Sequence, residues 1–229
     1  MTQFSRQIAP RRLPKTRTRP DRSTRERLLE VAGQVFAEKG FARATGKEIA
    51  MRAKENSAAV NYHFGGIENL YAEVVREAHN RLVTLEALSA AVAGQTEAEA
   101  KLASVIELFV RAVTGPASAS WVIRVMGREF VSPSPILENL RQKEILPKAT
   151  ILRSLVAELM RLKPDHPAVA RACISVLSPC FMLLVADRRI VKRAFPGLAI
   201  GSDDADELVA HFVRFALAGI AAAAEAARQ

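Results

Sequence analysis

The chain has 229 residues, of which 49% are hydrophobic and 25% are charged. Its formal net charge is +9 at pH 7 and its pI is about 10.1. This length and apolar content suffice for a real core, in one large domain or in a small and a medium one. The basic balance favours an anionic partner, and the longest uncharged run, 172–186, is too short to span a bilayer.

The first 22 residues are the most basic segment of the chain, and we expect them to form a disordered arm. They hold seven basic side chains against Asp21, which gives +6 of the total charge of +9. Pro10, Pro14 and Pro20 argue against a helix here. Two interpretations stay open, a solubilising extension and an arm that contacts DNA. The arm lacks the apolar core of a signal peptide, although its arginines also resemble those of a transit peptide.

The two cysteines bear on the location of the protein. Cys173 and Cys180 lie on one helix face of an apolar stretch, where a disulfide between them is geometrically impossible. We therefore expect buried free thiols in a reducing compartment, and a cytoplasmic protein.

Helix-start and helix-stop signals divide the first half of the chain. No sustained alternation of period 2 is present, so we predict an all-α fold. Capping boxes at 23–26 and 45–48 predict the starts of two helices, the first ending at Gly40. Asn56 is a good N-cap for a short third helix, which Gly65-Gly66 ends. A long helix is then expected from about 67 to 93.

The second half predicts five more helices. The first is capped at 96–99 and ends at 114–116, and the second covers about 120–131. The prolines of 132–135 force a break, and Pro135 suits the first turn of a helix that reaches about residue 162. Two strongly apolar helices follow, at about 168–193 and 203–226.

The second and third helices form a predicted helix-turn-helix unit. They are short, they are joined by a tight turn, and the third has a bare side of small residues. Val60 and Phe64 face inward, so Ser57, Ala58 and Asn61 face outward, where small side chains let a helix approach base edges in the major groove. The alternative is that 45–64 is a buried helical hairpin. Together we expect double-stranded DNA contacts from Thr45, Lys47, Ser57, Ala58, Asn61, Tyr62 and His63.

Three stretches of this region, "AGQVFAEKGFARAT", "EIAMRA" and "VNYHFGGIENLY", resemble the DNA-binding domain of the TetR family of bacterial regulators. The later "REFVSPSPIL" at 128–137 is similar to the subgroup with a CerR-type C-terminal domain. The resemblance implies a homodimer of all-α subunits on a palindromic operator. It also implies a small-molecule pocket in the C-terminal helices, and release of DNA when the effector binds.

Two positions depart from the family pattern. Lys54 and Glu55 occupy the turn, where a Gly-Val pair is usual, and a positive φ at Lys54 would cost roughly 1 kcal/mol. Ile67 stands where the family has a lysine that binds a phosphate, so that contact is expected to be lost. Lys47 and the basic arm could replace the missing charge.

The expected organisation is an arm at 1–22, a three-helix DNA-binding domain at 23–70, and a larger helical ligand-binding and dimerisation domain at 71–229. The helices at 168–193 and 203–226 are expected to form a four-helix dimer interface, the alternative being that both are simply core. Trp121, Phe181 and Met182 are expected to line the effector pocket, with Arg124 or Arg128 as its polar anchor.

The function predicted from the sequence is that of a ligand-responsive, DNA-binding transcriptional regulator. The specific prediction is a repressor that a small molecule releases from its operator. The alternative is a basic architectural DNA-binding protein without a ligand. An enzyme is disfavoured because the four histidines are scattered and no metal-ligand spacing is present, so no catalytic residue, metal or cofactor is expected. A membrane-surface protein is disfavoured because the arm has too few large apolar residues for an amphipathic anchor.

Overall fold

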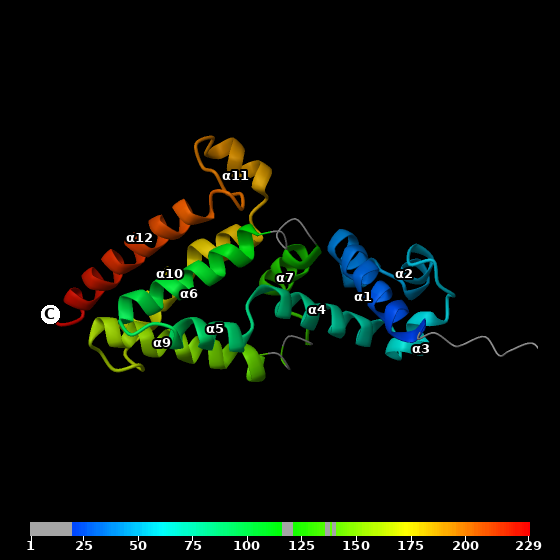
Figure 1. The fold of residues 1–229 in the computed structure, drawn as a ribbon, viewed down its shortest axis with the longest axis horizontal. Coiled ribbons are helices and arrows are strands. Elements are labelled where there is room, and N and C mark those ends of the chain that lie inside the picture. Colours follow the sequence, from blue (N-terminus) through cyan, green and yellow to red (C-terminus); the bar gives the residue numbers. More distant parts are fainter. Residues whose placement is uncertain (1–19, 116–120, 136–137, 139–140) are drawn as a thin grey trace, which may run out of the picture.

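The computed structural model describes residues 20–115, 121–135, 138 and 141–229. Within these residues every regular element is helical, which confirms the predicted all-α fold (Figure 1). The molecule is elongated, with the N-terminal helices at one end and the C-terminus at the other. Residues 1–19 of the predicted basic arm lie outside the described residues.

A small bundle forms the N-terminal end of the molecule. It consists of α1 (Pro20–Lys39), the 3₁₀ turn η1 (Phe41–Arg43), α2 (Gly46–Arg52), α3 (Ala59–Phe64) and α4 (Ile67–Leu82). Its core is made of apolar side chains spaced three or four residues apart on these helices, with Phe36 and Tyr71 packed edge to face at 4.8 Å between ring centroids. α4 leaves this bundle and runs into the larger domain (Figure 1).

Of the three caps predicted for this bundle, one is the observed N-cap of its helix. Thr45 Oγ1 accepts a hydrogen bond from the Glu48 amide at 3.2 Å, which confirms the cap of α2. Asn56 was predicted to cap α3, but the N-cap is Ala58, two residues later. Asn56 Oδ1 instead accepts a hydrogen bond from the Ala58 amide at 2.9 Å in the turn before the helix. The predicted start at 23–26 is wrong, because α1 already begins at Pro20. A proline is tolerated there since the first turn of a helix has no use for its N–H.

Two helices predicted to be continuous are broken in the structure. The helix predicted at 67–93 is interrupted at Val83, after which Thr84 caps α5 (Leu85–Ala93) by accepting a hydrogen bond from the Ala87 amide at 3.1 Å. The helix predicted at 168–193 ends at Val185, and Asp187 caps α11 (Arg188–Ala194) through the Arg189 amide at 2.8 Å. In both cases a good N-cap residue starts a second helix in a new direction.

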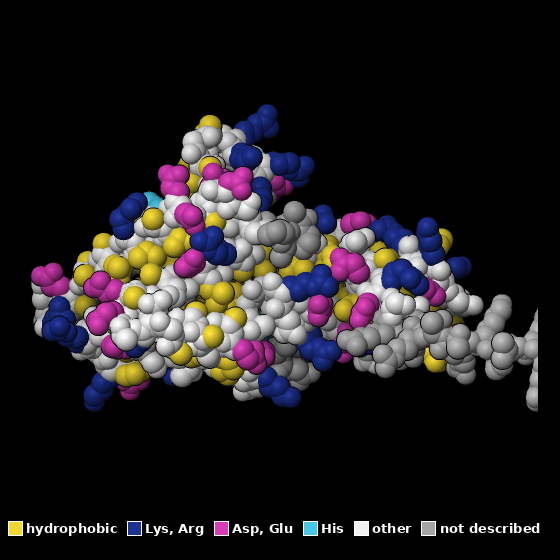
Figure 2. Space-filling model, viewed as in Figure 1, with side chains coloured by type: hydrophobic (Ala, Val, Ile, Leu, Met, Phe, Trp, Pro, Cys, Tyr) yellow, Lys and Arg dark blue, Asp and Glu magenta, His cyan; other side chains and the backbone are white. Residues whose placement is uncertain are grey.

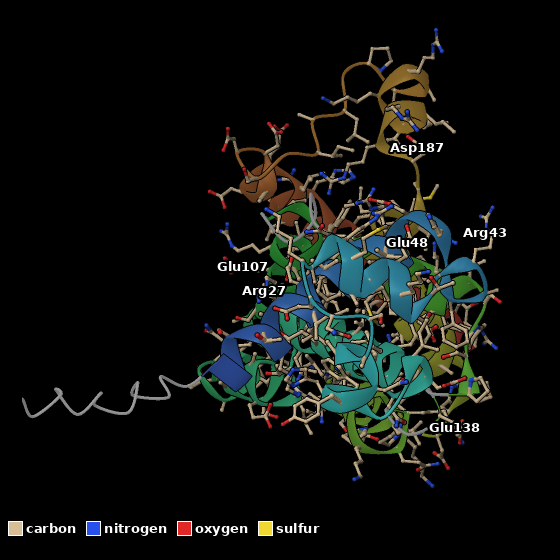
Figure 3. All side chains as sticks on the ribbon, turned by 90° about the vertical axis from the view of Figure 1, so that its right-hand side faces the viewer. Arg27, Arg43, Glu48, Glu107, Glu138 and Asp187 are labelled. Carbon is tan, nitrogen blue, oxygen red and sulfur yellow. The ribbon has the colours of Figure 1, made fainter. Side chains whose placement is uncertain are left out.

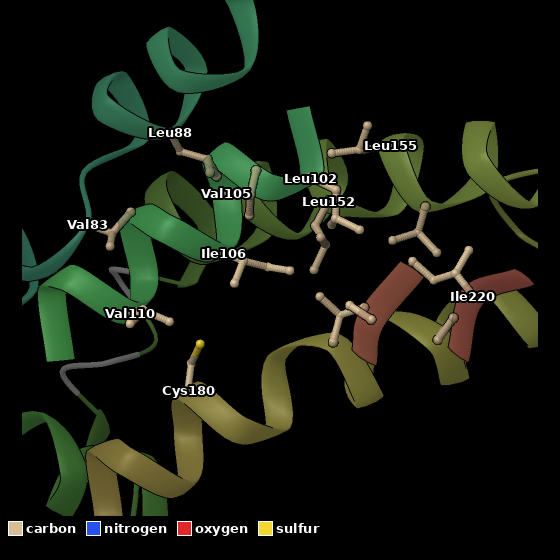
Figure 4. Close-up of a cluster of buried hydrophobic side chains, with 14 of the residues drawn as sticks. Val83, Leu88, Leu102, Val105, Ile106, Val110, Leu152, Leu155, Cys180 and Ile220 are labelled. Carbon is tan, nitrogen blue, oxygen red and sulfur yellow. The ribbon is translucent and has the colours of Figure 1, made fainter. Parts of the chain in front are cut away.

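The larger domain is a bundle around α6 (Ala98–Thr114), which packs against α5, α9 (Leu146–Met160), α10 (Pro167–Val185) and α12 (Ala205–Ala226). Figure 4 shows part of its core, where Leu102, Ile106 and Val110 of α6 meet side chains of the neighbouring helices. The π-helical turn η3 (Arg141–Ile145) leads into α9. α11 stands out from this bundle (Figure 1).

α7 (Trp121–Val131) joins the two cores. Its Trp121, Val122 and Val125 belong to the N-terminal core, whereas Ile123 belongs to the C-terminal one. The N-terminal core therefore includes residues from far along the chain, and it also includes the first three turns of α4.

α10 and α12 are long and apolar enough to cross a membrane by length and composition alone. Core helices of proteins outside membranes meet the same criterion. Only 33% and 17% of the most apolar windows of α10 and α12 are buried in the chain. Large apolar side chains therefore remain exposed on both helices, with Ile174 at 69%, Met182 at 60% and Phe215 at 70%.

Candidate nucleic-acid interface

The turn between α2 and α3 is held by its own backbone. The Lys54 amide donates to Met51 O at 3.1 Å and the Glu55 amide donates to Ala50 O at 2.9 Å. Lys54 has a φ of 58°, so the left-handed conformation considered from the sequence is present, at a cost of roughly 1 kcal/mol for a residue with a Cβ. This turn sets the angle between the two helices.

α3 has two faces of opposite character. Val60 and Phe64 are 2% and 8% exposed and pack into the N-terminal core. Ser57, Ala58 and Asn61 are exposed, as the spacing predicted. The outer side of the α3 region therefore presents small side chains and one amide, with no bulky apolar group between them.

An aromatic pair flanks the outer face of α3. Tyr62 is 78% exposed, and its ring lies edge-on to the partly buried ring of His63, with centroids 4.9 Å apart. Such an exposed tyrosine keeps its hydroxyl available to a partner. The two side chains extend the outer face toward the end of the helix.

Two more predicted contact residues lie at the start of α2. Thr45 is exposed, and its hydroxyl oxygen is already used as the N-cap, so only its hydroxyl proton remains to be donated. Lys47 is exposed and has no ion pair within the described residues. A lysine with this freedom can follow a phosphate.

α2 is fixed to α1 by a network of charges. Glu48 Oε1 lies 2.6 Å from Lys39 Nζ and 2.9 Å from an Arg52 nitrogen, and Arg52 also contacts Glu38 at 2.7 Å. The hydrogen bond from Lys39 and the charge of Arg52 hold the pKa of Glu48 below its ordinary value. Figure 3 shows Glu48 on α2 and the exposed Arg43, whose Nε donates to Lys39 O at the end of α1 at 3.2 Å.

Two glycines make the junction between α3 and α4. Gly65 has a φ of 74° and caps α3 by donating its amide to Asn61 O at 2.9 Å, and Gly66 has a φ of 140°. Arg25 supports the junction from α1, because its guanidinium lies 4.8 Å from the Phe64 ring centroid and 2.9 Å from Glu73. The side chain of Asn61 itself points out of this packing and is exposed.

Trp121 does not lie where it was expected. It is 2% exposed, and its indole Nε1 donates to Glu30 of α1 at 2.7 Å. Its ring covers Gly33, where any added Cβ would lie 2.3 Å from a ring carbon. The prediction that Trp121 lines an effector pocket is therefore corrected, since the ring fills a gap in α1 and anchors α7 to the N-terminal core.

A buried carboxylate also joins α7 to α4. Glu129 of α7 is 2% exposed, and it accepts hydrogen bonds from the Tyr71 hydroxyl at 2.5 Å, the Ser134 amide at 3.0 Å and the Ser134 hydroxyl at 2.8 Å. Burial, and then the hydrogen bond and charge of Glu129, raise the pKa of Tyr71. Arg128 extends from the same helix to the end of α1, where it donates to Ala37 O at 3.4 Å and Glu38 O at 3.5 Å.

A cleft of about 1220 Å³ lies beside these contacts, between the N-terminal bundle, α7 and the end of α10. We call it the interdomain cleft. Arg124 and Arg128, the two alternatives for the polar anchor, both line it, whereas Phe181 and Met182 do not. Phe181 stacks on Phe130 at 4.4 Å between centroids, and Met182 is exposed on α10. The cleft also includes residues that the sequence did not indicate, among them Phe41, Tyr71, Glu129 and Val131.

The side chains of a type that can bind a metal ion are dispersed in the parts of the chain that the structure describes. No group of three or more His, Cys, Asp or Glu residues lies close enough there to hold a metal ion. Cys173 and Cys180 are free thiols, and burial raises the pKa of Cys180 to about 12. The thiol of Cys180 is therefore protonated and unreactive at neutral pH.

Two family profiles match the chain. The profile of the bacterial regulatory proteins of the tetR family matches residues 28–74, which contain α2, α3 and most of α1. The profile of the C-terminal domain of the HTH-type transcriptional dual regulator CecR matches residues 98–220, more than half of the chain. The subgroup suggested by "REFVSPSPIL" is therefore that of CecR, and the name CerR used for it above is corrected. Among curated proteins, none matches the chain.

Solved structures share the whole fold. The ketosteroid transcriptional regulator KstR2 of Mycobacterium tuberculosis has a TM-score of 0.64 and 17% identity, over 85% of this chain and 93% of that one. A tetR-family regulatory protein from Rhodococcus RHA1 has a TM-score of 0.63 and 22% identity, over 86% and 96%. The fatty acid degradation regulator FadR from Bacillus halodurans has a TM-score of 0.57 and 13% identity, over 89% and 97%. At these identities the likeness concerns the fold.

Proposed function

The chain belongs to the TetR family of bacterial DNA-binding transcriptional regulators, with a CecR-type C-terminal domain, and we propose that it is a ligand-responsive repressor. Regulators of this family bind DNA operators and small-molecule effectors and act as dimers; they are not enzymes. For this chain the proposal is a cytoplasmic homodimer that leaves a palindromic operator when an effector binds. The observation that carries it is the bare outer face of α3 on a helix whose other face is fully buried.

In this proposal α3 lies in the major groove. Ala58 and Ser57 allow close approach of the backbone, and the Asn61 amide reads a base edge as both donor and acceptor. Tyr62, His63, Thr45 and Lys47 contact phosphates on either side and fix the position of the helix. The basic arm adds further phosphate contacts, and with Lys47 it replaces the charge missing at Ile67.

The proposed division of the chain keeps the arm at 1–22, the DNA-binding domain at 23–70 and the ligand-binding and dimerisation domain at 71–229. The dimer forms through α10 and α12. Their exposed Ile174 and Phe215 would be buried. A Cβ added at Gly219 would meet no atom within 4 Å beyond its own stretch of helix, so this position would allow close approach of the partner. Figure 2 shows hydrophobic side chains gathered on the surface of the C-terminal helices. Exposed apolar patches of this kind mark association sites.

The effector is proposed to use Arg124 and Arg128 as its polar anchors, because both line the interdomain cleft. Phe181 and Met182 lie on α10 beyond the lining of that cleft. They therefore contribute to an effector site only if α10 shifts, and Met182 is better placed for the dimer face.

A selection experiment tests the function. The purified full-length protein is used to enrich bound sequences from random DNA, and the enriched site is then titrated in the presence of small-molecule libraries. A repressor of this kind selects a palindrome and releases it with at least one compound. An architectural protein, the second function considered, would select no sequence and would respond only to salt.

A further inference from the structure

The interdomain cleft is lined by both charged and apolar side chains, and it touches both domains. We propose that this cleft is the effector site, and that its ligand is an amphipathic organic anion with an acidic group at one end of an apolar body. This inference rests on the proposed ligand-responsive function and adds the place and the chemistry of the ligand.

The anionic end of the ligand is required by two arginines of α7. Arg124 and Arg128 lie four residues apart, so their side chains leave the same face of the helix, and both line the cleft. Like charges at this spacing repel each other. Arg124 is exposed and has no hydrogen-bond or ion-pair partner within the described residues, and Arg128 contacts only backbone oxygens there. An acidic group between them would relieve the repulsion and accept charge-assisted hydrogen bonds from both.

Three of the other charged side chains of the cleft, Lys39, Asp187 and Arg189, are held in ion pairs. Five basic and three acidic side chains line it, so the balance is positive. Glu129 is occupied by Tyr71 and Ser134, and hydrogen bonds from Arg189 lower the pKa of Asp187 to about 2 and keep it ionised. Lys39 is paired with Glu48, and Arg188 donates to Val113 O at 2.5 Å. The charges of the cleft without an ion-pair partner among the described residues are therefore those of Arg124, Arg128 and Arg188, opposed by the exposed Glu68 and the buried Glu129. Arg124 and Arg128 are the two of these that leave one face of one helix.

The apolar body of the ligand is required by the rest of the lining. Phe41 is 38% exposed, Val131 73% and Val185 41%, although all three are large apolar side chains. With Ile123, Pro133, Pro135 and Leu183 they give the cleft walls that water solvates poorly. A volume of about 1220 Å³ is ample for a ligand with a long chain or several rings.

The position of Arg128 explains how such a ligand would act on DNA binding. Its hydrogen bonds to Ala37 O and Glu38 O are long, at 3.4 and 3.5 Å, and they satisfy carbonyls at the end of α1 that have no partner within the helix. A carboxylate or sulfonate is a stronger acceptor than these carbonyls. Binding would draw Arg128 away from α1, the helix on which α2 and α3 pack. The ligand thereby loosens the contact that orients the helix-turn-helix unit.

Two related fluorescent probes separate charge from shape. 8-Anilinonaphthalene-1-sulfonate is an amphipathic anion, and N-phenyl-1-naphthylamine has the same ring skeleton without the sulfonate. Both are titrated into the full-length protein and into Arg124→Gln, Arg128→Gln and the control Arg153→Gln. Arg153 is exposed on α9 and does not line the cleft, so its variant loses the same charge from the same domain.

The expected result is one anionic probe bound per protomer, with affinity at least tenfold lower in Arg124→Gln and in Arg128→Gln and unchanged in Arg153→Gln. The neutral probe should bind all four proteins alike. Because Arg124 is exposed and unpartnered among the described residues, Arg124→Gln tests the site even if Arg128→Gln disturbs the fold. The proposal is overturned if the anionic probe does not bind the wild type, or if it binds Arg124→Gln as tightly as the wild type.

A measurement of operator release tests the proposed anion site and the proposed ligand-responsive function separately. If the anionic probe releases operator DNA from the wild type and fails to do so in Arg124→Gln, both stand. If it binds at the arginines without releasing DNA, the anion site stands and its role as the effector site is overturned. If another compound releases DNA equally well from wild type and Arg124→Gln, the ligand-responsive function stands and the cleft is not its site.

Discussion

The outer face of α3 and the outer faces of α10 and α12 are both helix surfaces that the chain leaves uncovered, but their chemistry is opposite. The α3 region exposes Ser57, Ala58 and Asn61, which water solvates at little cost. α10 and α12 expose Ile174 and Phe215, and leaving a side chain of this size in water costs about 1.5–3 kcal/mol relative to burying it. The first face is stable in water and the second is not.

This difference separates two kinds of partner. A face that is already solvated gains little from burial, so its partner must offer hydrogen bonds and charge, as a DNA groove does. A face of exposed apolar side chains gains from the removal of water and suits a second copy of the same surface.

Placing a charge on the apolar face should abolish the dimer. Gly219 of α12 is exposed with no atom within 4 Å of a built Cβ, so Gly219→Arg is compatible with the single chain. In a dimer the arginine would be buried without a partner. We expect a monomer by light scattering, and operator affinity about 100-fold lower or worse because the two half-sites are no longer linked.

Ala90→Arg provides the matched control for this change. Ala90 is an exposed small residue of α5, outside the proposed interface, and its variant adds the same charge. It should stay dimeric and bind the operator normally. A wild-type protein that is monomeric, or a Gly219→Arg variant that remains a full dimer, would exclude α12 as the interface.

Changing the outer face of α3 should weaken DNA binding without affecting the fold. Asn61→Ala should cost roughly 1–3 kcal/mol on the operator and relax the preference at one position of each half-site. Ala58→Leu should block approach to the groove, although this exposed position accepts a leucine in the free protein. Binding curves on operator and scrambled DNA, with Tm measured alongside, give the result.

The neighbouring aromatic pair serves as a contrast to Asn61. Tyr62→Phe and His63→Ala should weaken all DNA sequences about equally, because phosphates carry no sequence information. If Asn61→Ala or Ala58→Leu instead lowers the Tm and leaves operator affinity per folded molecule intact, this face is core and the groove assignment fails.

The helix-turn-helix unit could be predicted from the sequence because its signals are local. Thr45, Asn56 and Gly65 each act within four residues of their own position, and the structure shows all three making those contacts. The resemblance to the TetR family lies in the same stretch and is confirmed by the matching profile. The exposure of Ala58 and Asn61 follows from helical spacing alone.

The helix breaks and the place of Trp121 could not be predicted in the same way, because they depend on contacts between distant parts of the chain. The break at Val83 is supported by Lys148 of α9, whose Nζ donates to Val83 O at 2.5 Å. Trp121 fills the gap above Gly33, and nothing near either residue in the sequence indicates the other. Thr84 and Asp187 were the available signals for the two broken helices, because both residue types are good N-caps. An apolar pattern that continued past them concealed the breaks.

The contact between His79 of α4 and Lys148 of α9 should make the stability of the protein depend on pH. Burial, and then the nearby charge of Lys148, hold the pKa of His79 below its ordinary value. Lys148 Nζ lies 3.1 Å from His79 Nε2 and 3.2 Å from Glu144 Oε2. The charge of Glu144 acts in the opposite direction but is the smaller effect. The unfolded chain therefore takes up a proton on this histidine at a higher pH than the folded chain does. Stability from this group is present above pH 6.5 and is lost as the pH falls below it.

His79→Gln should reduce this loss. Thermal unfolding at pH 7 and pH 5 should show a smaller drop in Tm for the variant than for the wild type. Arg153→Gln, at an exposed position of α9 outside the proposed interface, serves as the control and should behave as the wild type does. An equal drop in all three proteins would show that other groups cause the acid sensitivity.

The smallest expected effect compares one backbone position in each domain. Lys54 and Arg161 are the residues other than glycine with positive φ in the described parts of the chain, at 58° and 54°. Glycine removes the clash of the Cβ, worth roughly 1–2 kcal/mol, but also loosens the unfolded chain by about 0.4–1 kcal/mol. Lys54→Gly and Arg161→Gly should therefore each stabilise the protein by about 0.5 kcal/mol, whereas the matched alanine variants, which keep the Cβ, should be neutral.

If calorimetry shows one unfolding transition, both glycine variants should raise its Tm alike. Two transitions, each raised by only one variant, would mean that the domains unfold separately despite the contact of Trp121 with α1. Stabilisation by the alanine variants would show that the lysine and arginine side chains, not the left-handed backbone, carry the strain.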